Sequence, residues 1–168
     1  MQRLAYSDAL ILGILNRVGT IAMVGASANW NRPSFFAMKY LQEKGYRVIP
    51  VNPGLAGQQL LGERVYAALG AIPFPFEMVD IFRNAEAAGP IVDQAIALQA
   101  SRKIEVVWMQ LGVIAAAAAA RAEAAGLTVV MDRCPKIEFG RLHSELSWGG
   151  FDSGVITAKR RRLKVARP

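Results

Sequence analysis

The chain has 168 residues, 53% of them apolar, and a formal net charge of +7. Its apolar runs are all shorter than the ~20 residues of a membrane-spanning helix, and its single cysteine, Cys134, excludes an internal disulfide. Six positive charges lie in residues 159–168 and leave +1 on residues 1–158, so we do not expect a nucleic-acid-binding domain. The tail is interpreted as a solvated end, with a contact to RNA, a membrane surface or an acidic partner as the alternative.

Secondary-structure patterns alternate along the chain. Residues 6–17 are expected to form an opening helix. Short, β-branched apolar runs predict strands at 20–25, 47–51, 78–82, 104–109 and 127–131. Helical patterns lie at 34–44, 84–101 and 113–125. Gly45 and Gly126 close two of these helices at the position where a left-handed backbone is needed. Residues 52–76 contain three Pro and four Gly and predict a loop with short elements.

The strand patterns predict the fold class. Nearly continuous apolar strands are typical of a parallel sheet that is covered on both faces. Their alternation with helices predicts an α/β fold of three layers, with a doubly wound, Rossmann-like, mainly parallel five-stranded sheet. We expect a helix in residues 1–19 packed on a domain of residues 20–142, and an extension of residues 143–168 with the basic tail. The start has no secretory signal pattern, so a cytoplasmic location is expected.

Residues after the first strand form the first candidate binding loop, because ligands of open α/β sheets bind beyond the carboxyl ends of the strands. Gly25 allows a sharp turn, Ser27 offers a hydroxyl, and Ser34 is placed to cap the following helix. A helix start is a site for phosphate, and Arg32 adds a positive charge. The alternative is that Ser34 or Asn31 only caps the helix, Pro33 starts it and Arg32 is solvated.

The end of the second strand argues against NAD. An NAD site has an acidic residue there, about 20 residues after a loop with three glycines. This chain has Val51, Asn52, Pro53 and Gly54 instead, and only one glycine in the first loop. Asn52 and Pro53, with backbone groups, are instead expected to contact an adenine or a 3′-phosphorylated ribose. NADP or another adenine nucleotide, with a phosphate near an arginine, remains an alternative.

Three sequence blocks carry a family resemblance: VIPVNPG at 48–54, VWMQLG at 107–112 and MDRCPKIE at 131–138. With GAS at 25–27 and RPS at 32–34, they resemble the small stand-alone CoA-binding domain proteins, which are similar to the CoA-binding domain of the succinyl-CoA synthetase alpha subunit. The resemblance extends from about Thr20 to Leu142.

This resemblance implies a Rossmann-like fold that binds coenzyme A across the strand ends. It implies the pyrophosphate near Gly25, Ala26, Ser27 and Arg32, the adenosine end near Val51, Asn52 and Pro53, the middle near Phe82 and Arg83, and the pantetheine arm near Gln110 and Gly112. The synthetase needs a phosphohistidine from a further domain and an ATP-grasp partner. The only histidine, His143, is interpreted as a surface or structural residue, so the synthetase reaction is not expected.

Cys134 is the best candidate for chemistry. Arg133 and Lys136 flank it, and nearby positive charge favours the thiolate. This leaves open an enzyme that handles acyl-CoA or CoA disulfide through Cys134. The other interpretation is a small buried residue at a strand end. Because no nearby histidine or second cysteine supports a reaction, we assign no catalytic residue and no metal site.

Other polar and aromatic residues have open interpretations. Asp80 and Arg83 are expected to form a surface ion pair. Asp132 and Glu138 are expected to neutralise neighbouring basic residues. Trp30 could stack on an adenine or cover the apolar underside of its own loop.

The sequence therefore favours a protein that binds coenzyme A or a short acyl-CoA without catalytic machinery. A small molecule is the expected partner, whereas nucleic acid is not. A homo-oligomer is left open, and the segment around Trp148 is not placed.

Overall fold

Five parallel strands form the centre of the computed structural model, which describes residues 4–143. The strand order is β2-β1-β5-β6-β7, and every neighbouring pair is parallel. The strands are β1 (Thr20–Val24), β2 (Arg47–Val51), β5 (Met78–Ile81), β6 (Val106–Met109) and β7 (Thr128–Val130). The chain passes from β1 to β2 at one edge and then returns to β5 on the other side of β1. The predicted α/β fold with a five-stranded parallel sheet is confirmed.

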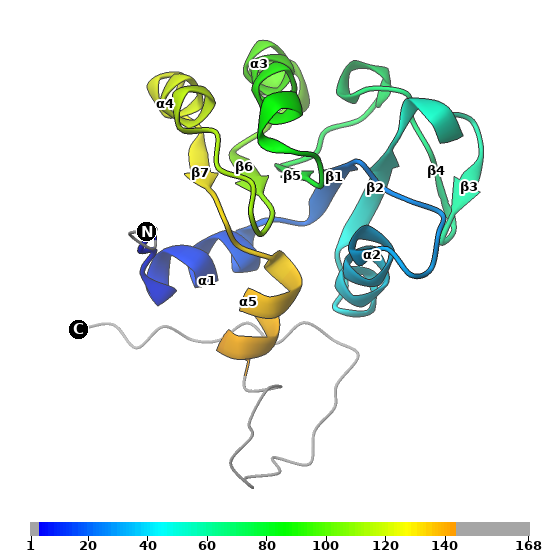
Figure 1. The fold of residues 1–168 in the computed structure, drawn as a ribbon, viewed down its shortest axis with the longest axis horizontal. Helices are drawn as coiled ribbons and strands as arrows, with labels where there is room; N and C mark the ends of the chain where they lie inside the picture. Colours follow the sequence, from blue (N-terminus) through cyan, green and yellow to red (C-terminus); the bar gives the residue numbers. More distant parts are fainter. Residues whose placement is uncertain (1–3, 144–168) are drawn as a thin grey trace, which may run out of the picture.

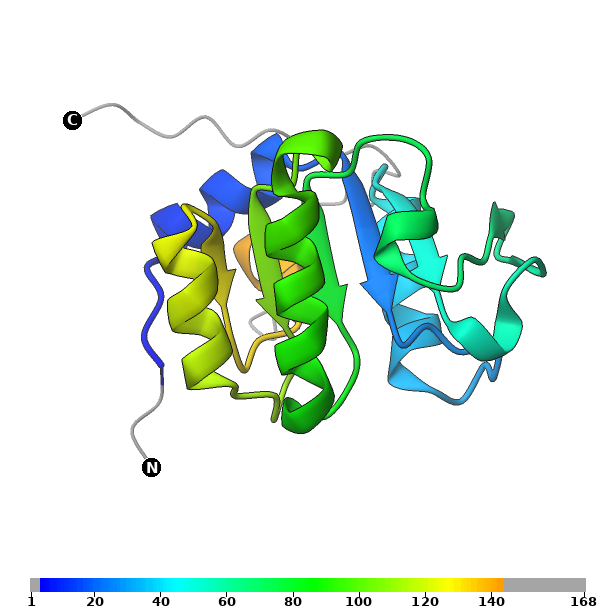
Figure 2. The same ribbon diagram turned by 90° about the horizontal axis from the view of Figure 1, so that it is seen from above.

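Helices cover both faces of the sheet (Figure 1). The helices α3 (Ala85–Arg102) and α4 (Ala116–Ala124) lie on one face, and α1 (Asp8–Arg17), α2 (Pro33–Glu43) and α5 (Pro135–Leu142) lie on the other. Figure 2 shows the same arrangement from above, with α3 and α4 in front of the strands. This gives the three layers that the sequence predicts.

Each strand supplies apolar side chains to two cores because successive residues point to opposite faces. In β1, Ala22 packs in the core under α3 and α4, whereas Ile21 and Met23 pack in the core under α1, α2 and α5. The alanine-rich helix α4 buries Ala118 and Ala122 against the sheet. The near-continuous apolar character of the strands therefore follows from coverage on both sides.

The irregular stretch after β2 contains several short elements. They are the 3₁₀ turns η1 (Pro53–Leu55) and η2 (Leu69–Ala71) and the antiparallel pair β3 (Gln59–Leu60) and β4 (Glu63–Arg64). A bridge between Val51 and Tyr66 ties this segment to the edge strand β2. The predicted loop with short elements is confirmed.

Helix boundaries match the sequence patterns except at two places. Gly45 and Gly126 have φ angles of +89° and +88° just beyond α2 and α4, as expected for helix ends. The pattern at 113–125 predicts an earlier start for α4, but a turn at Val113, whose N–H donates to the carbonyl of Gln110, delays the helix to Ala116. The helix α5 is not predicted at all, because the sequence patterns end with the strand at 127–131.

The expected division of the chain is only partly within the described region. The opening helix begins at Asp8, where the Ser7 hydroxyl accepts a hydrogen bond from the Leu10 N–H at 3.2 Å. The residues from 144 onward, with Trp148 and the basic tail, lie outside the described residues. Within residues 4–143 no helix has the length and apolarity needed to cross a bilayer. The same residues contain no cluster of His, Cys, Asp and Glu suited to a metal ion.

Candidate functional site

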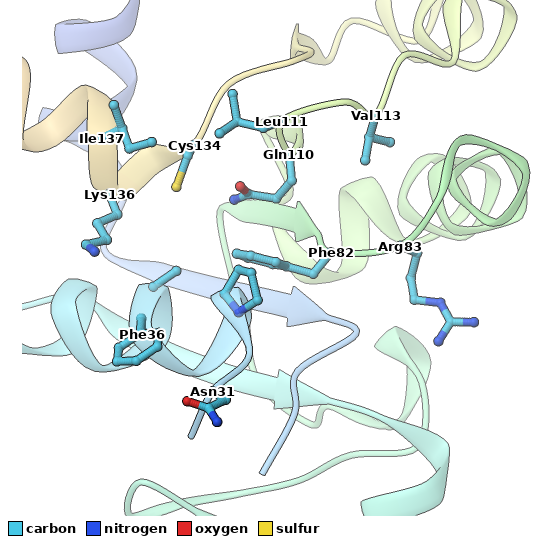
Figure 3. A pocket seen from close by; sticks show the side chains of 12 residues that line it. Asn31, Phe36, Phe82, Arg83, Gln110, Leu111, Val113, Cys134, Lys136 and Ile137 are labelled. Atoms are coloured by element: carbon cyan, nitrogen blue, oxygen red, sulfur yellow. The ribbon is translucent and has the colours of Figure 1, made fainter. Parts of the chain in front are cut away.

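A pocket of about 610 Å³ opens at the carboxyl ends of β1, β5, β6 and β7 (Figure 3). Helices α2 and α5 contribute its remaining walls. Its volume lies within the range of roughly 300–1,000 Å³ typical of small-molecule sites. The lining residues are Asn31, Pro33, Phe36, Ala37, Phe82, Arg83, Gln110, Leu111, Val113, Cys134, Lys136 and Ile137.

Gly25 brings the loops after β1 and β5 into direct contact. Its φ angle is +89°, and a Cβ atom at this position would lie 2.7 Å from the carbonyl oxygen of Phe82. Its N–H donates to the carbonyl of Val51 at 3.0 Å. Asn52 Nδ2 donates to the carbonyl of Ala26 at 2.8 Å. The predicted residues after β1 and β2 therefore form one hydrogen-bonded loop cluster beside the pocket.

The predicted cap of α2 is wrong. The helix begins at Pro33, and Arg32 precedes it as the capping residue without a side-chain hydrogen bond. Ser34 is already inside the helix and only 4% exposed, and the N–H of Asn31 donates to Asn29 Oδ1 within the loop. Proline favours the first helical position, and the helix starts at Pro33 as the alternative has it. Arg32 is exposed and does not line the pocket.

Asp80 is fully buried in the middle of the sheet, so the expected surface ion pair with Arg83 is wrong. Its carboxylate oxygens accept hydrogen bonds from Gln110 Nε2 at 2.9 and 3.2 Å. Burial raises the pKa of Asp80 to about 7, against the opposing effect of that hydrogen bond. Arg83 instead lines the pocket, with its guanidinium directed away from Gln110 (Figure 3).

Cys134 lies in the pocket wall immediately before α5 and is 8% exposed. Burial raises its pKa, and the nearby Asp80 acts in the same direction. Hydrogen bonds from the backbone N–H groups of Ile137 and Lys136 oppose this rise. The guanidinium of Arg133 donates to two backbone carbonyl groups at 2.6 and 2.8 Å. The charge of Lys136 also lowers this pKa, but burial is the largest effect. The structure therefore favours the interpretation of Cys134 as a small buried residue over the thiolate alternative.

The remaining charged residues after β7 stabilise the loops. Glu138 accepts a hydrogen bond from Arg141 at 2.7 Å, as expected for charge neutralisation. Asp132 accepts one from the backbone N–H of Gly112 at 2.8 Å, and Gly112 has a φ angle of +76°. Gly112 therefore positions the loop after β6 but does not line the pocket.

Two aromatic side chains also have clear positions. The ring of His143 stacks on Phe139 with centroids 3.9 Å apart, which fits a structural residue. Trp30 is 65% exposed, so it does not cover the underside of its loop.

Three of the expected ligand-binding residues line the pocket, Phe82, Arg83 and Gln110, together with the candidate thiol Cys134. Asn31, Pro33 and Lys136, which the sequence singles out for other reasons, also line it. Sequence reasoning missed the apolar side chains of Phe36, Leu111 and Ile137, which are 47%, 57% and 45% exposed. No sequence signal separates the two helical residues from core positions. Leu111 could have been found, since it follows Gln110 directly at a strand end.

Comparison with known proteins gives one family match. Residues 19–140 match the family model described as CoA binding domain. The uncharacterised protein YneT of Bacillus subtilis (strain 168) is 34% identical over 131 residues, which are 78% of this chain and 93% of YneT.

Solved structures share the fold. A hypothetical protein from Pyrococcus horikoshii OT3 is 36% identical, with a TM-score of 0.76 over 85% of this chain and 99% of its own. The apo form of a dinucleotide-forming acetyl-coenzyme A synthetase 1 from Ca. Korarchaeum cryptofilum is 18% identical, with a TM-score of 0.55 over 67% of this chain and 25% of the synthetase. At that identity the synthetase supports the fold alone.

Proposed function

The chain belongs to the CoA-binding domain family, and from this premise we propose that it binds coenzyme A, or a short acyl-CoA, across the carboxyl ends of its strands. In this proposal it acts as a binding protein without catalytic machinery of its own. The observation that carries the proposal is the pocket between α2 and α5, which joins an apolar interior to cationic ends.

The chemistry of the pocket fits the two halves of coenzyme A. Arg83 and Lys136 lie at opposite ends of the pocket (Figure 3). Phe36, Leu111 and Ile137 line the same pocket with partly exposed apolar side chains. Cationic groups suit the phosphates, and covering exposed apolar side chains with the pantetheine arm is favourable by about 25 cal/mol per Å².

The loop cluster beside the pocket is proposed to hold the nucleotide half. Val51 is 2% exposed and the side chain of Asn52 is already hydrogen-bonded to Ala26 and Gly54, so both shape the site rather than contact the ligand by their side chains. Backbone groups around Gly25, with the exposed side chain of Arg32, are left for the pyrophosphate. Pro53 is proposed to border the adenosine.

Isothermal titration of the full chain with coenzyme A tests this proposal. We expect saturable binding, and we expect dephospho-CoA to bind with a different affinity if the 3′-phosphate is contacted. NADP should fail to displace coenzyme A. Absence of heat and of thermal stabilisation at millimolar coenzyme A would overturn the proposal, and displacement by NADP would favour the general adenine-nucleotide site.

Two variants separate charge in the pocket from charge elsewhere. Arg83→Ala is expected to weaken coenzyme A binding about 10- to 100-fold, because a charge-assisted hydrogen bond contributes about 1.5–3 kcal/mol. Arg121→Ala is the matched control: this arginine pairs with Asp93 on the far face of the sheet, and both are about half exposed. Equal losses in both variants would argue against a phosphate contact at Arg83.

A Cys134→Ser variant separates binding from catalysis. A binding protein keeps its affinity for coenzyme A in this variant, because serine preserves the size of the side chain. Turnover of an acyl-CoA or CoA disulfide by the native chain that disappears in the variant would instead establish the enzyme alternative.

A further inference from the structure

The side chain of Gln110 presents a hydrogen-bond acceptor to the interior of the pocket. Gln110 is only 7% exposed, and its Nε2 lies 2.9 and 3.2 Å from the two carboxylate oxygens of Asp80. Because an ionised carboxylate only accepts hydrogen bonds, an N–H of the amide must face Asp80. The amide oxygen Oε1 is then directed away from Asp80 and has no hydrogen-bond partner within residues 4–143.

This oxygen lies at the enclosed part of the pocket. Figure 3 shows the end of the Gln110 side chain and the sulfur of Cys134 turned toward the same space beside the ring of Phe82. Gln110, Cys134 and Val113 are the most buried lining residues apart from Ala37, at 7%, 8% and 7% exposure. A ligand arm that enters between the cationic ends therefore meets the amide of Gln110 at its most buried part.

Lys136, the polar lining residue that follows Cys134 on α5, is directed elsewhere. The ammonium group of Lys136 lies 5.7 Å from the centroid of the Tyr40 ring. In Figure 3 it points away from Gln110. Gln110 is therefore the polar side chain best placed to form a hydrogen bond with the end of a bound pantetheine arm.

We propose that Gln110 makes the pocket select free coenzyme A over its acyl thioesters, with Asp80 as the positioning residue that fixes the amide. This inference rests on the proposed binding of coenzyme A. A thiol carries a hydrogen and is a weak donor toward Oε1. The sulfur of a thioester carries no hydrogen, and the thioester carbonyl oxygen only accepts hydrogen bonds. An acyl-CoA therefore places an acceptor beside the acceptor Oε1 of Gln110. A desolvated acceptor without a partner weakens binding.

Protonation of Asp80 gives this selection a characteristic pH dependence. A protonated carboxyl group can donate its O–H to Oε1, which allows the amide to turn its N–H groups into the pocket. Burial raises the pKa of Asp80 to about 7, so both forms are accessible near neutral pH. Two polar groups face Asp80, the amide of Gln110 and the thiol of Cys134. The residues paired with Asp80 on the neighbouring strands are Met23 and Trp108, whose side chains do not titrate.

The test is the ratio of the dissociation constants of acetyl-CoA and coenzyme A, measured by calorimetry on the full chain at pH 7.5 and pH 6.0. Both ligands carry the same phosphates, so the titration of those groups cancels in the ratio. We expect coenzyme A to bind about fivefold more tightly at pH 7.5, which corresponds to one weak hydrogen bond. We expect the ratio to fall toward one at pH 6.0.

Two variants assign the effect to the proposed residues. Gln110→Met removes the acceptor at similar size and is expected to bring the ratio to about one at both pH values. Gln94→Met is the control, since Gln94 is exposed on α3 outside the pocket. Asp80→Asn is expected to remove the pH dependence of the ratio, because an asparagine does not titrate.

The outcomes separate this inference from the proposed function. If the native chain binds neither ligand, the proposed function is wrong and the inference falls with it. If it binds both equally at pH 7.5, the inference is wrong while the proposed function stands, and this result needs no variant. A ratio that Gln94→Met changes as much as Gln110→Met also overturns the inference.

Discussion

At the scale of single residues, Gly25 is the position where backbone conformation and loop contact coincide. An alanine at this position must adopt a φ angle near +89° and would place its Cβ atom 2.7 Å from the carbonyl oxygen of Phe82. We expect Gly25→Ala to lower the free energy of unfolding by roughly 3 kcal/mol, because backbone strain and displacement of the neighbouring loop add. Urea denaturation measures this loss.

Gly45→Ala is the matched control for Gly25→Ala. Gly45 has the same φ angle of +89°, but a Cβ atom there would meet no atom within 4 Å. The expected loss is therefore only the conformational part, about 1–2 kcal/mol. Equal losses in the two variants would show that the contact with Phe82 contributes nothing.

Asp80 makes the stability of the fold dependent on pH. Burial raises its pKa from 3.8 to about 7, so the native state retains a proton that the unfolded chain releases above about pH 4. The stability contributed by this proton is fully present below that value and is lost as pH rises to about 7. We expect the stability of Asp80→Asn relative to that of the native chain to rise by up to about 1.4 kcal/mol per pH unit across this window.

Denaturation curves of both proteins at pH 5 and pH 8 measure this difference. The difference in the free energy of unfolding between Asp80→Asn and the native chain should be more favourable to the variant at pH 8 than at pH 5. Parallel profiles would mean that Asp80 does not titrate in this range, and would also remove the physical basis for a pH-dependent ligand preference.

At the scale of elements, α5 has two faces with separate functions. Phe139 is 2% exposed and packs edge-on against Tyr40 and Tyr46, with ring centroids 6.1 Å apart in both pairs. Ile137 lies on the other side and lines the pocket at 45% exposure. The helix therefore closes the core with one side chain and the candidate site with another.

Alanine variants of these two residues should affect different properties, stability in one case and ligand binding in the other. Phe139→Ala is expected to lower the free energy of unfolding by about 3–5 kcal/mol, the usual range for a buried phenylalanine. Ile137→Ala is expected to change stability by less than about 1 kcal/mol and to weaken coenzyme A binding. Denaturation and calorimetry on both variants check this. A large stability loss in Ile137→Ala would contradict the division of the helix into two faces.

The strands could be predicted from the sequence because coverage on both faces makes them continuously apolar. The helix α5 could not, because it is only eight residues long and contains Gly140. The segments that hold Arg83 and Gln110 could be identified because they follow strands, whereas the two residues themselves came from the family resemblance. Phe36 could not, because its place over the pocket depends on how α2 packs on the sheet. The burial of Asp80 was missed because a charged residue near a strand end is usually exposed.

At the scale of the whole molecule, the pocket exists only when the sheet and its helices are assembled. Its walls come from α2 near the start of the chain and from α5 at the end of the described region. The loops that follow β5 and β6 supply the wall between them. Because unfolding separates all of these segments, a ligand of this pocket binds the native state and not the unfolded chain. Binding should therefore stabilise the entire fold.

Coenzyme A should raise the midpoint of thermal unfolding without a plateau. At a free concentration 100 times the dissociation constant the expected stabilisation is about 2.7 kcal/mol. For a domain of this size that is a rise of roughly 5–10 °C. Each further tenfold increase in coenzyme A adds about 1.4 kcal/mol, because the stabilisation depends on the logarithm of the ligand concentration.

Two variants serve as controls for this rise of the midpoint. Arg83→Ala should show the same increase per tenfold change in coenzyme A, displaced to higher concentration, whereas Arg121→Ala should follow the native curve. The contrary outcome is a midpoint that stops rising at coenzyme A concentrations where the native site is saturated. It would mean that the ligand also binds the unfolded chain. A site on a single loop allows this, whereas a pocket built from both ends of the fold does not.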